Sequence, residues 1–160
     1  MLSGLGGCAA IMAVLVVSGW FVGADSAALL VASMGASAVL LFAVPHGALS
    51  QPWAVVGGHV VSAIVGTTCA VLLGSTLVGA ALAVGLAIGV MQLLRCVHPP
   101  GGATALSAVI GGPGVHALGF GYVFTPVLLN AAVIVLVAVA FNAFFGWRRY
   151  PAAFASERRN

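Results

Sequence analysis

The stretch "RCVHPPGGATALSAVIGG", Arg95 to Gly112, interrupts a chain that otherwise has the composition of a lipid-embedded protein. Arg95 is the only charged residue between Asp25 and Arg148, and a histidine, two prolines and two glycines follow it within seven residues. Irregular backbone at membrane depth is tolerated only inside protein or beside a wet cavity. The stretch is therefore predicted to face the interior rather than lipid.

The composition predicts an integral membrane protein. The 160 residues are 62% hydrophobic and 4% charged, with a mean hydropathy of +1.24, whereas about a quarter of the residues of a soluble domain are charged. We expect one transmembrane domain, 1–147, followed by a basic cytoplasmic tail, 148–160. Four of the five arginines follow Gly146, a bias typical of the positive-inside rule and not of nucleic-acid binding.

Catalytic and metal sites are not expected. The three cysteines are scattered without CxxC spacing, and the four histidines have no acidic partners in the sequence. Asp25 and Glu157 are the only carboxylates, with Asp25 expected on the outer, non-cytoplasmic side and Glu157 in the tail, so paired acid–base chemistry is implausible. No nucleotide or hydrolase motif is present. We expect no enzyme activity, no metal and no cofactor.

Six apolar segments follow one another, and a span needs roughly 20 apolar residues. Four are long and continuous: Gly4–Gly23, Pro52–Gly74, Ser75–Leu94 and Pro126–Gly146. Two are expected to be broken or half-helical: Ser26–Val44, at "SMGAS", and Gly101–Phe124, at "GGPG". No basic region precedes the first segment, which is therefore expected to be a retained span and not a signal peptide.

The two broken segments resemble each other. "GASAVLL" at Gly35–Leu41 aligns with "GATALSA" at Gly102–Ala108, with Ser opposite Thr. Each follows a good span and precedes a Pro/Gly-rich turn and a span that begins with proline. This order predicts two three-segment halves, about 4–74 and 75–147. The alternative is that small residues recur by chance in Gly/Ala-rich helices.

The arginines decide between two topologies. If Arg95 and the C-terminal arginines are all cytoplasmic, an even number of crossings separates them, and the chain crosses six times with both termini inside. The fold is then an all-α membrane fold of two inverted three-segment repeats, an arrangement typical of transporters. If the broken segments are re-entrant, four crossings remain and the charge rule is violated.

The broken segments also suggest an anion site. Helix starts at Gly101–Thr104 and Gly35–Ser37 would direct free N–H groups into a shared cavity, where glycine permits close approach. The alternative is ordinary capping and turn formation. The substrate-binding candidates are Arg95, His98, Gly101, Gly102, Ala103, Thr104, Gly35, Ala36 and Ser37.

Several of these side chains have a structural alternative. Arg95 is either a topology anchor or a fixed charge that attracts anions, and His98 is either a hydrogen-bonded loop residue or a titratable ligand. His59, Gln92 and Asn130 are interpreted first as helix–helix hydrogen-bonding residues and second as pore-lining or proton-carrying groups.

The motif "HPPGGATAL", together with "MGASAVLLFAVPHGALSQPWAVVGGH" and the closing "WRRYP", resembles the HPP family of integral membrane proteins. Some members are nitrite transporters, and the resemblance implies a small monovalent anion as cargo. It also implies a multi-pass protein, which we place in the bacterial inner (cell) membrane. The family is often described with four transmembrane helices, against the six crossings predicted here.

These observations predict a homo-oligomeric transporter or channel for a small inorganic anion, with nitrite as the leading candidate and the lipid bilayer as the other partner. The alternative is a structural or sensory membrane module that binds partner proteins and transports nothing. That alternative predicts a tightly packed centre without a water-accessible cavity.

Overall fold

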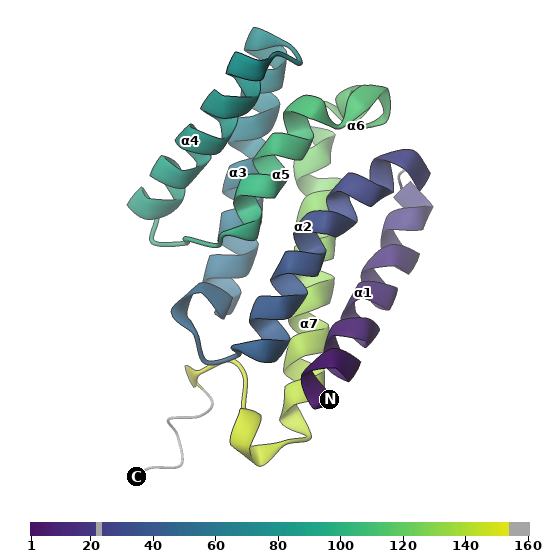
Figure 1. The fold of residues 1–160 in the computed structure, drawn as a ribbon, viewed down its shortest axis with the longest axis vertical. Helices are drawn as coiled ribbons and strands as arrows, with labels where there is room; N and C mark the ends of the chain where they lie inside the picture. Colours follow the sequence, from purple (N-terminus) through teal and green to yellow (C-terminus); the bar gives the residue numbers. More distant parts are fainter. Residues whose placement is uncertain (22–23, 154–160) are drawn as a thin grey trace.

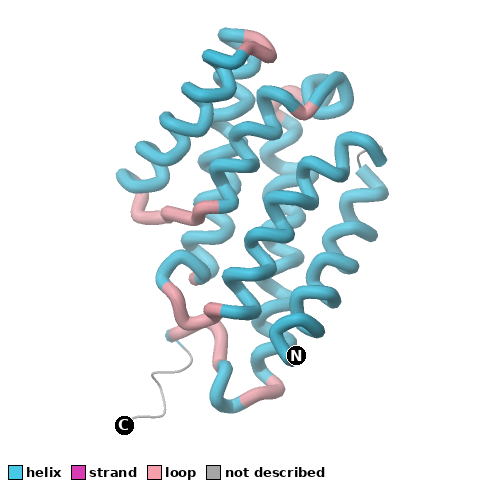
Figure 2. The backbone as a smooth tube through the Cα atoms, viewed as in Figure 1, coloured by secondary structure: helices cyan, strands magenta, loops and turns pink. Residues whose placement is uncertain are grey.

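The computed structural model describes the backbone of residues 1–21 and 24–153 and the side chains of 1–20 and 31–153. Within these residues the chain is helical, with no strand (Figures 1 and 2). The elements are α1 (Leu2–Phe21), α2 (Ala24–Ala43), the 3-10 helix η1 (Ala48–Ser50), α3 (Pro52–Leu73), α4 (Leu77–Leu93), α5 (Pro100–Ile110), α6 (Gly112–Leu118), the π-helix η2 (Val123–Leu128), α7 (Leu129–Ala143) and the 3-10 helix η3 (Gly146–Arg148).

Local sequence signals account for the boundaries around α3 and α4. Pro52 occupies the first turn of α3, where the missing N–H has no helical partner to lose. The helix ends at Gly74, whose φ of 66° lies in the left-handed region that favours glycine. Thr76 then caps α4, because its hydroxyl accepts from the backbone N–H of Gly79 at 3.0 Å. The predicted segments 52–74 and 75–94 are thus confirmed almost to the residue.

The expectation of a break in the second segment is wrong. α2 runs without interruption through "SMGAS", so no helix begins at Gly35–Ser37. A glycine inside a helix costs about 1 kcal/mol relative to alanine, which tertiary packing readily offsets. The Ser37 hydroxyl also lies 3.2 Å from the carbonyl of Ser33, so it has an acceptor within the helix as well as partners outside it.

The fifth segment is broken, as predicted. α5 ends at Ile110, and after Gly111 the chain turns into α6, which begins at Gly112, whose φ is 78°. A kink at Thr125, whose φ of −126° and ψ of 115° are not helical, interrupts η2, and the helix that leads into α7 begins at Pro126, as predicted. Counted from Val123 across this kink, the apolar span extends to Ala143.

Successive helices run in alternating directions, so the N-terminus and η3 lie at the same end of the bundle (Figure 1). α5 begins part-way along the bundle and not at its end (Figure 1). By length and composition three helices can cross a membrane, Leu2–Trp20, Pro52–Leu73 and Val123–Ala143. Leu77–Leu93 and Pro100–Ile110 are shorter apolar helices, and the part of α2 whose side chains are described, Val31–Ala43, is apolar as well. The loop that carries His98, Pro99 and Pro100 therefore lies part-way along the bundle, with the His98 side chain buried.

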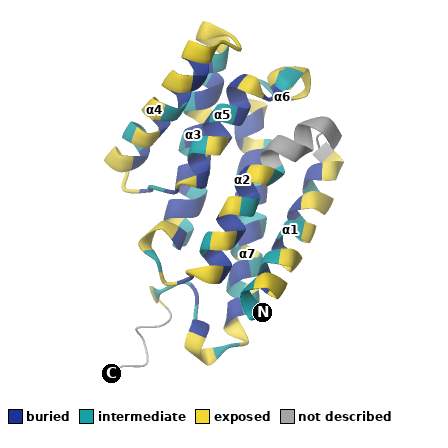
Figure 3. Cartoon of the chain, in the orientation of Figure 1, coloured by how far each residue is buried: buried dark blue, intermediate teal, exposed yellow. Residues whose placement is uncertain are grey.

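The distribution of burial is that of a membrane protein. Large apolar side chains such as Leu72 and Leu77 point outward, 74% and 92% exposed (Figure 3). Polar side chains are instead buried in the centre, among them Ser18, Ser37 and Asn130. Lipid solvates the apolar exterior, whereas polar groups within the membrane need partners inside the bundle.

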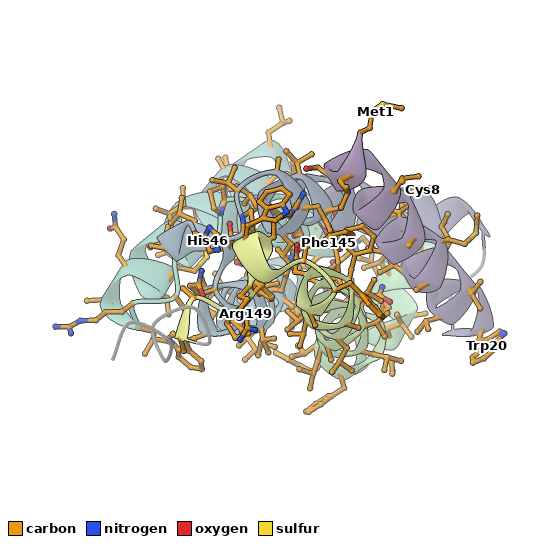
Figure 4. The ribbon with its side chains drawn as sticks, turned by 90° about the horizontal axis from the view of Figure 1, so that it is seen from below. Met1, Cys8, Trp20, His46, Phe145 and Arg149 are labelled. Atoms are coloured by element: carbon orange, nitrogen blue, oxygen red, sulfur yellow. The ribbon has the colours of Figure 1, made fainter. Side chains whose placement is uncertain are left out.

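Residues 146–152, which include η3, lie against the bundle and are hydrogen-bonded to it. We call this segment the C-terminal strap. Arg148 is buried and donates to Asn142 Oδ1, Ser3 Oγ and the Phe42 carbonyl. At the end seen in Figure 4, the His46 ring donates to the Arg149 carbonyl at 3.1 Å.

Tyr150 completes this fastening. Its hydroxyl donates to the Ser50 carbonyl at 2.8 Å, and burial raises the pKa of the phenol, which keeps that donor proton in place. The first residues of the predicted tail, 148–152, therefore lie against the transmembrane domain; residues 154–160 and the Asp25 side chain fall outside the described residues.

Candidate functional site

Four polar side chains from separate parts of the chain meet in the middle of the bundle. Ser37 comes from α2, His59 from α3, His98 from the loop before α5, and Thr104 from α5, and each is 0% exposed. We call this group the central cluster. Polar groups at this depth are costly unless paired, and in membrane proteins they commonly mark the path of a substrate or a proton.

Short hydrogen bonds connect the central cluster. Ser37 Oγ lies 2.8 Å from His59 Nε2 and 2.8 Å from His98 Nε2. On the other side of the His59 ring, Nδ1 lies 2.7 Å from Thr104 Oγ1. The ring centroids of His59 and His98 are 5.0 Å apart in an edge-on arrangement. One imidazole, His59, thus bridges the hydroxyls of two different helices.

Glycines on α3 and α5 make room for this arrangement. A Cβ added at Gly58 would lie 2.6 Å from the Cβ of His98, and one added at Gly101 would lie 3.0 Å from the Gly58 carbonyl. Further along, a Cβ at Gly66 would lie 2.5 Å from the Ala105 carbonyl. Small residues at these positions therefore allow α3 and α5 to approach closely enough for His59 to reach Thr104.

The backbone orients His98. Its Nδ1 donates to the carbonyl of Leu49, in η1, at 2.8 Å. Pro99 and Pro100 then begin α5 immediately after the histidine, which fixes the direction in which the chain leaves the loop. His98 is thereby held with Nε2 aimed at Ser37.

The predicted site residues are only partly brought together. Ser37, His98 and Thr104 are in the central cluster, and His59, which we interpreted first as a packing residue, is its centre. Gly101 is buried beside it. The remaining residues of the two aligned segments, Gly35, Ala36, Gly102 and Ala103, are half-buried or exposed on other faces of α2 and α5.

Three predicted residues lie away from the cluster. Arg95 and Gln92 are exposed near the end of α4. Asn130 is fully buried on α7, where its Nδ2 donates to Ser18 Oγ at 2.8 Å and its Oδ1 has no hydrogen-bond partner. Asn130 and Ser18 thus form a buried polar pair apart from the central cluster, which contains the HPP histidine.

The first turn of α5 does not present the free N–H groups that an anion site at a helix start needs. The Gly101 N–H donates to the His98 carbonyl at 2.8 Å and the Gly102 N–H to the Pro99 carbonyl at 3.0 Å. Pro99 and Pro100 have no N–H to offer. In this conformation the donors available at the centre are side-chain hydroxyls and imidazoles.

Sequence reasoning did not identify two groups at the cluster's edge. The Leu49 carbonyl accepts from His98, and the Tyr122 hydroxyl donates to the Thr104 carbonyl at 3.1 Å. A backbone acceptor leaves no mark in sequence, whereas Tyr122, a polar aromatic at the end of the broken fifth segment, offered a signal. Among the described residues, no group of three or more His, Cys, Asp or Glu side chains is placed to hold a metal ion.

The central cluster is occluded in this conformation, because all four of its side chains are 0% exposed. A hollow of about 370 Å³ is lined by residues of α3, α5 and α6 and of the α3–α4 turn, among them Thr67, His116 and Ser75. Another, against α1 and α2, is lined by residues that include Ser3, Cys8 and Phe42. Neither of these two hollows has a residue of the cluster in its lining.

An apolar exterior, a polar interior and spanning helices define an integral membrane protein with a buried polar centre. A family model described as "HPP, transmembrane region" matches residues 1–151. The chain belongs to the HPP transmembrane-region family.

Two transmembrane proteins of Dictyostelium discoideum are similar to this chain. One is 43% identical over 126 residues, covering 76% of this chain and 44% of the relative; the other is 44% identical over 126 residues, covering 76% and 40%. The chain thus spans less than half the length of these relatives. No solved structure matches.

Proposed function

We propose that this chain is a transporter or channel for a small monovalent anion, with nitrite as the leading candidate. The observation that carries the proposal is that Ser37 and Thr104, the aligned hydroxyls of the two resembling segments, both hydrogen-bond to the His59 imidazole. The O–H and N–H groups of the central cluster, none of which belongs to a permanently charged side chain, offer hydrogen bonds to an anion that has shed its water.

The helix neighbours support the inverted-repeat part of this proposal. α1 packs against α2 and α7, while α4 packs against α5 and α3. A two-fold relation between residues 4–74 and 75–147 exchanges these two sets of neighbours, with α2 and α5 in contact at its axis. In such folds the substrate site lies at the interface of the repeats, near the membrane midplane. Ser37 and Thr104 come from α2 and α5, the two helices that this relation would exchange, and both contact His59.

The same proposal includes six crossings with both termini in the cytoplasm, a homo-oligomer, and a site in the cell membrane of a bacterium. Arg95 and the arginines of the C-terminal strap are then on the cytoplasmic side, as the positive-inside rule favours. Access to the occluded cluster requires a second conformation, as alternating access does in transporters generally.

A second candidate function is a membrane module that holds partner proteins and transports nothing. It is favoured by the complete burial of the cluster, whose hydrogen bonds join α2, α3 and α5 as a structural network would. The two candidates differ in what happens when the network is weakened without loss of packing.

Nitrite uptake into proteoliposomes tests the proposal. Thr104→Val removes one hydroxyl of the central cluster at nearly constant volume, and Thr68→Val is the matched control, because Thr68 donates within α3 to the Ile64 carbonyl. We expect uptake by the wild-type chain and the control, and at least tenfold slower uptake by Thr104→Val at equal reconstitution. No wild-type uptake above empty liposomes would reject nitrite transport; equal uptake by both variants would remove the central cluster from the path.

A further inference from the structure

The hydrogen bonds of the central cluster have one consistent direction when both histidines are neutral. A carbonyl only accepts, so His98 Nδ1 carries the proton that it donates to Leu49, and Nε2 is left as an acceptor. Ser37 must then donate to His98 Nε2. Since the single Ser37 proton is used, His59 Nε2 donates to Ser37 Oγ, and His59 Nδ1 accepts the Thr104 hydroxyl proton.

This order leaves no side chain of the central cluster unpaired. It runs from Thr104 through His59 and Ser37 to His98, with heavy-atom distances of 2.7, 2.8 and 2.8 Å. All three are at the short end of the range for hydrogen bonds that involve O–H and N–H groups. An imidazole that accepts at one nitrogen and donates from the other can pass a proton across its ring without moving.

We propose that Thr104, His59, Ser37 and His98 form a proton relay that places one proton on His98 when the transported anion enters the centre. The coupling to an anion rests on the function proposed above; the relay itself rests on the geometry of the four side chains. The proton comes from a hydronium ion or from the conjugate acid of the anion on the Thr104 side.

One proton enters the cluster on the Thr104 side, and three further proton transfers carry the charge to His98. The incoming proton binds Thr104 Oγ1 as the Thr104 proton moves to His59 Nδ1. The His59 Nε2 proton moves to Ser37 Oγ, and the Ser37 proton moves to His98 Nε2. Each hydroxyl ends with one proton, His59 ends neutral with its proton on Nδ1, and His98 ends as an imidazolium.

The loaded arrangement is hydrogen-bonded throughout. His98 Nε2 donates to Ser37 Oγ, Ser37 donates to His59 Nε2, and His59 Nδ1 donates to Thr104 Oγ1. The Thr104 hydroxyl turns to the Pro100 carbonyl, which lies 3.5 Å away, or to the anion. The reverse transfers return the proton to the anion as it leaves.

The loaded relay supplies a positive charge that the resting cluster lacks. Arg95 is exposed and does not reach the cluster. Two other titratable groups lie near it, and both are uncharged in their ordinary forms. The Tyr122 phenol, between α6 and η2, donates to the Thr104 carbonyl. The Cys96 thiol, two residues before His98, packs against α3, where a Cβ added at Gly57 would lie 3.4 Å from the sulfur. An imidazolium at His98 is therefore the counter-charge for an anion at the centre, and anion and proton cross together.

The relay predicts a coupled change in the two imidazoles that ¹⁵N NMR of histidine-labelled protein in liposomes measures. With both rings neutral we expect His59 as the Nε2–H tautomer and His98 as the Nδ1–H tautomer. When His98 takes its second proton on acidification, His59 should switch to the Nδ1–H tautomer over the same pH range. In Ser37→Ala the switch should be lost, and in Ser37→Thr it should remain.

The outcome that overturns the relay is equally specific. Ser37 has a second acceptor in the Ser33 carbonyl, and direct protonation of His98 with Ser37 turned to Ser33 would leave the His59 tautomer unchanged. An unchanged His59 tautomer, or the opposite tautomers in the neutral state, rejects the proposal. This result does not depend on whether any anion is transported.

A flux experiment tests the coupling separately. Proteoliposomes that contain a trapped pH-sensitive dye should acidify inside by about one proton per nitrite taken up, after subtraction of empty liposomes. His59→Gln should abolish acidification, whereas His116→Gln, outside the cluster, should keep it. Nitrite uptake without acidification would overturn the coupling and leave the proposed function standing. Absence of nitrite uptake would reject nitrite transport, and the NMR result would then decide the relay alone.

Discussion

The segments Gly35–Leu41 and Gly102–Ala108 have nearly the same letters but occupy different structural contexts. The first lies inside the uninterrupted helix α2, and the second forms the start of α5. Even so, Ser37 and Thr104 both reach the His59 ring, one at each nitrogen. What the two segments share is a hydroxyl on an inward face, and a helix terminus is not needed to place it there.

The largest effect is expected when the His59 imidazole, the shared partner of Ser37 and Thr104, is removed. His59→Leu leaves Ser37 and Thr104 without their common partner, and each lost interhelical hydrogen bond costs about 1–2 kcal/mol. We expect a total loss of about 2–4 kcal/mol and no measurable nitrite uptake. Thermal unfolding in detergent and the uptake assay check both effects. His116→Leu serves as the control, since His116 lies near the opposite end of α5 from the cluster; a similar loss of uptake there would contradict a special role for His59.

Alanine substitutions at glycines in and next to the two segments distinguish a packing role from a role in the approach of a ligand to the backbone. Gly101→Ala would place a Cβ 2.7 Å from Ser62 Oγ and 3.0 Å from the Gly58 carbonyl, so we expect a loss of about 1–3 kcal/mol from overpacking. A Cβ added at Gly35 would have no atom within 4 Å, and one added at Gly102 would lie 3.8 Å from the side chain of Val84. These two substitutions should be neutral or stabilising by up to about 1 kcal/mol.

Nitrite uptake by the same variants tests whether an anion approaches the backbone at these glycines. Because Gly35 and Gly102 lie off the central cluster, their alanine variants should transport at the wild-type rate. A stable Gly102→Ala variant with lost uptake would mean that an anion approaches the backbone of α5, as the sequence suggested. Unfolding temperature and uptake rate measured on one preparation distinguish these outcomes.

Much of the fold follows from the sequence because proline, glycine and apolar run length determine the ends of membrane helices. Pro52, Gly74 and Gly112 sit at or beside predicted boundaries. The break expected in α2 was wrong because "SMGAS" has the residue types of a turn, while tertiary packing keeps it helical.

The site was predictable in its residue types but not in its centre. The resemblance of the two segments pointed to Ser37 and Thr104, and the HPP motif pointed to His98. His59 looked like a packing residue because only the approach of α3 to both α2 and α5 shows that its ring has two hydroxyl partners. Arg95 drew attention as a lone charge, but the backbone turn at the end of α4 leaves it exposed.

The smallest loss of nitrite uptake is expected at Arg95. An exposed arginine outside the cluster can raise the local anion concentration but makes no hydrogen bond to a buried anion, and exposed charges are strongly screened by salt. Arg95→Ala should therefore slow nitrite uptake by less than about threefold at low salt, with the difference vanishing as ionic strength rises. Arg95→Gln, which keeps a polar side chain, should behave in the same way, because only the charge matters in this interpretation. A salt-independent loss comparable to that of Thr104→Val would place Arg95 on the transport path in a second conformation, and the imidazolium at His98 would then not be the only cation that the anion meets.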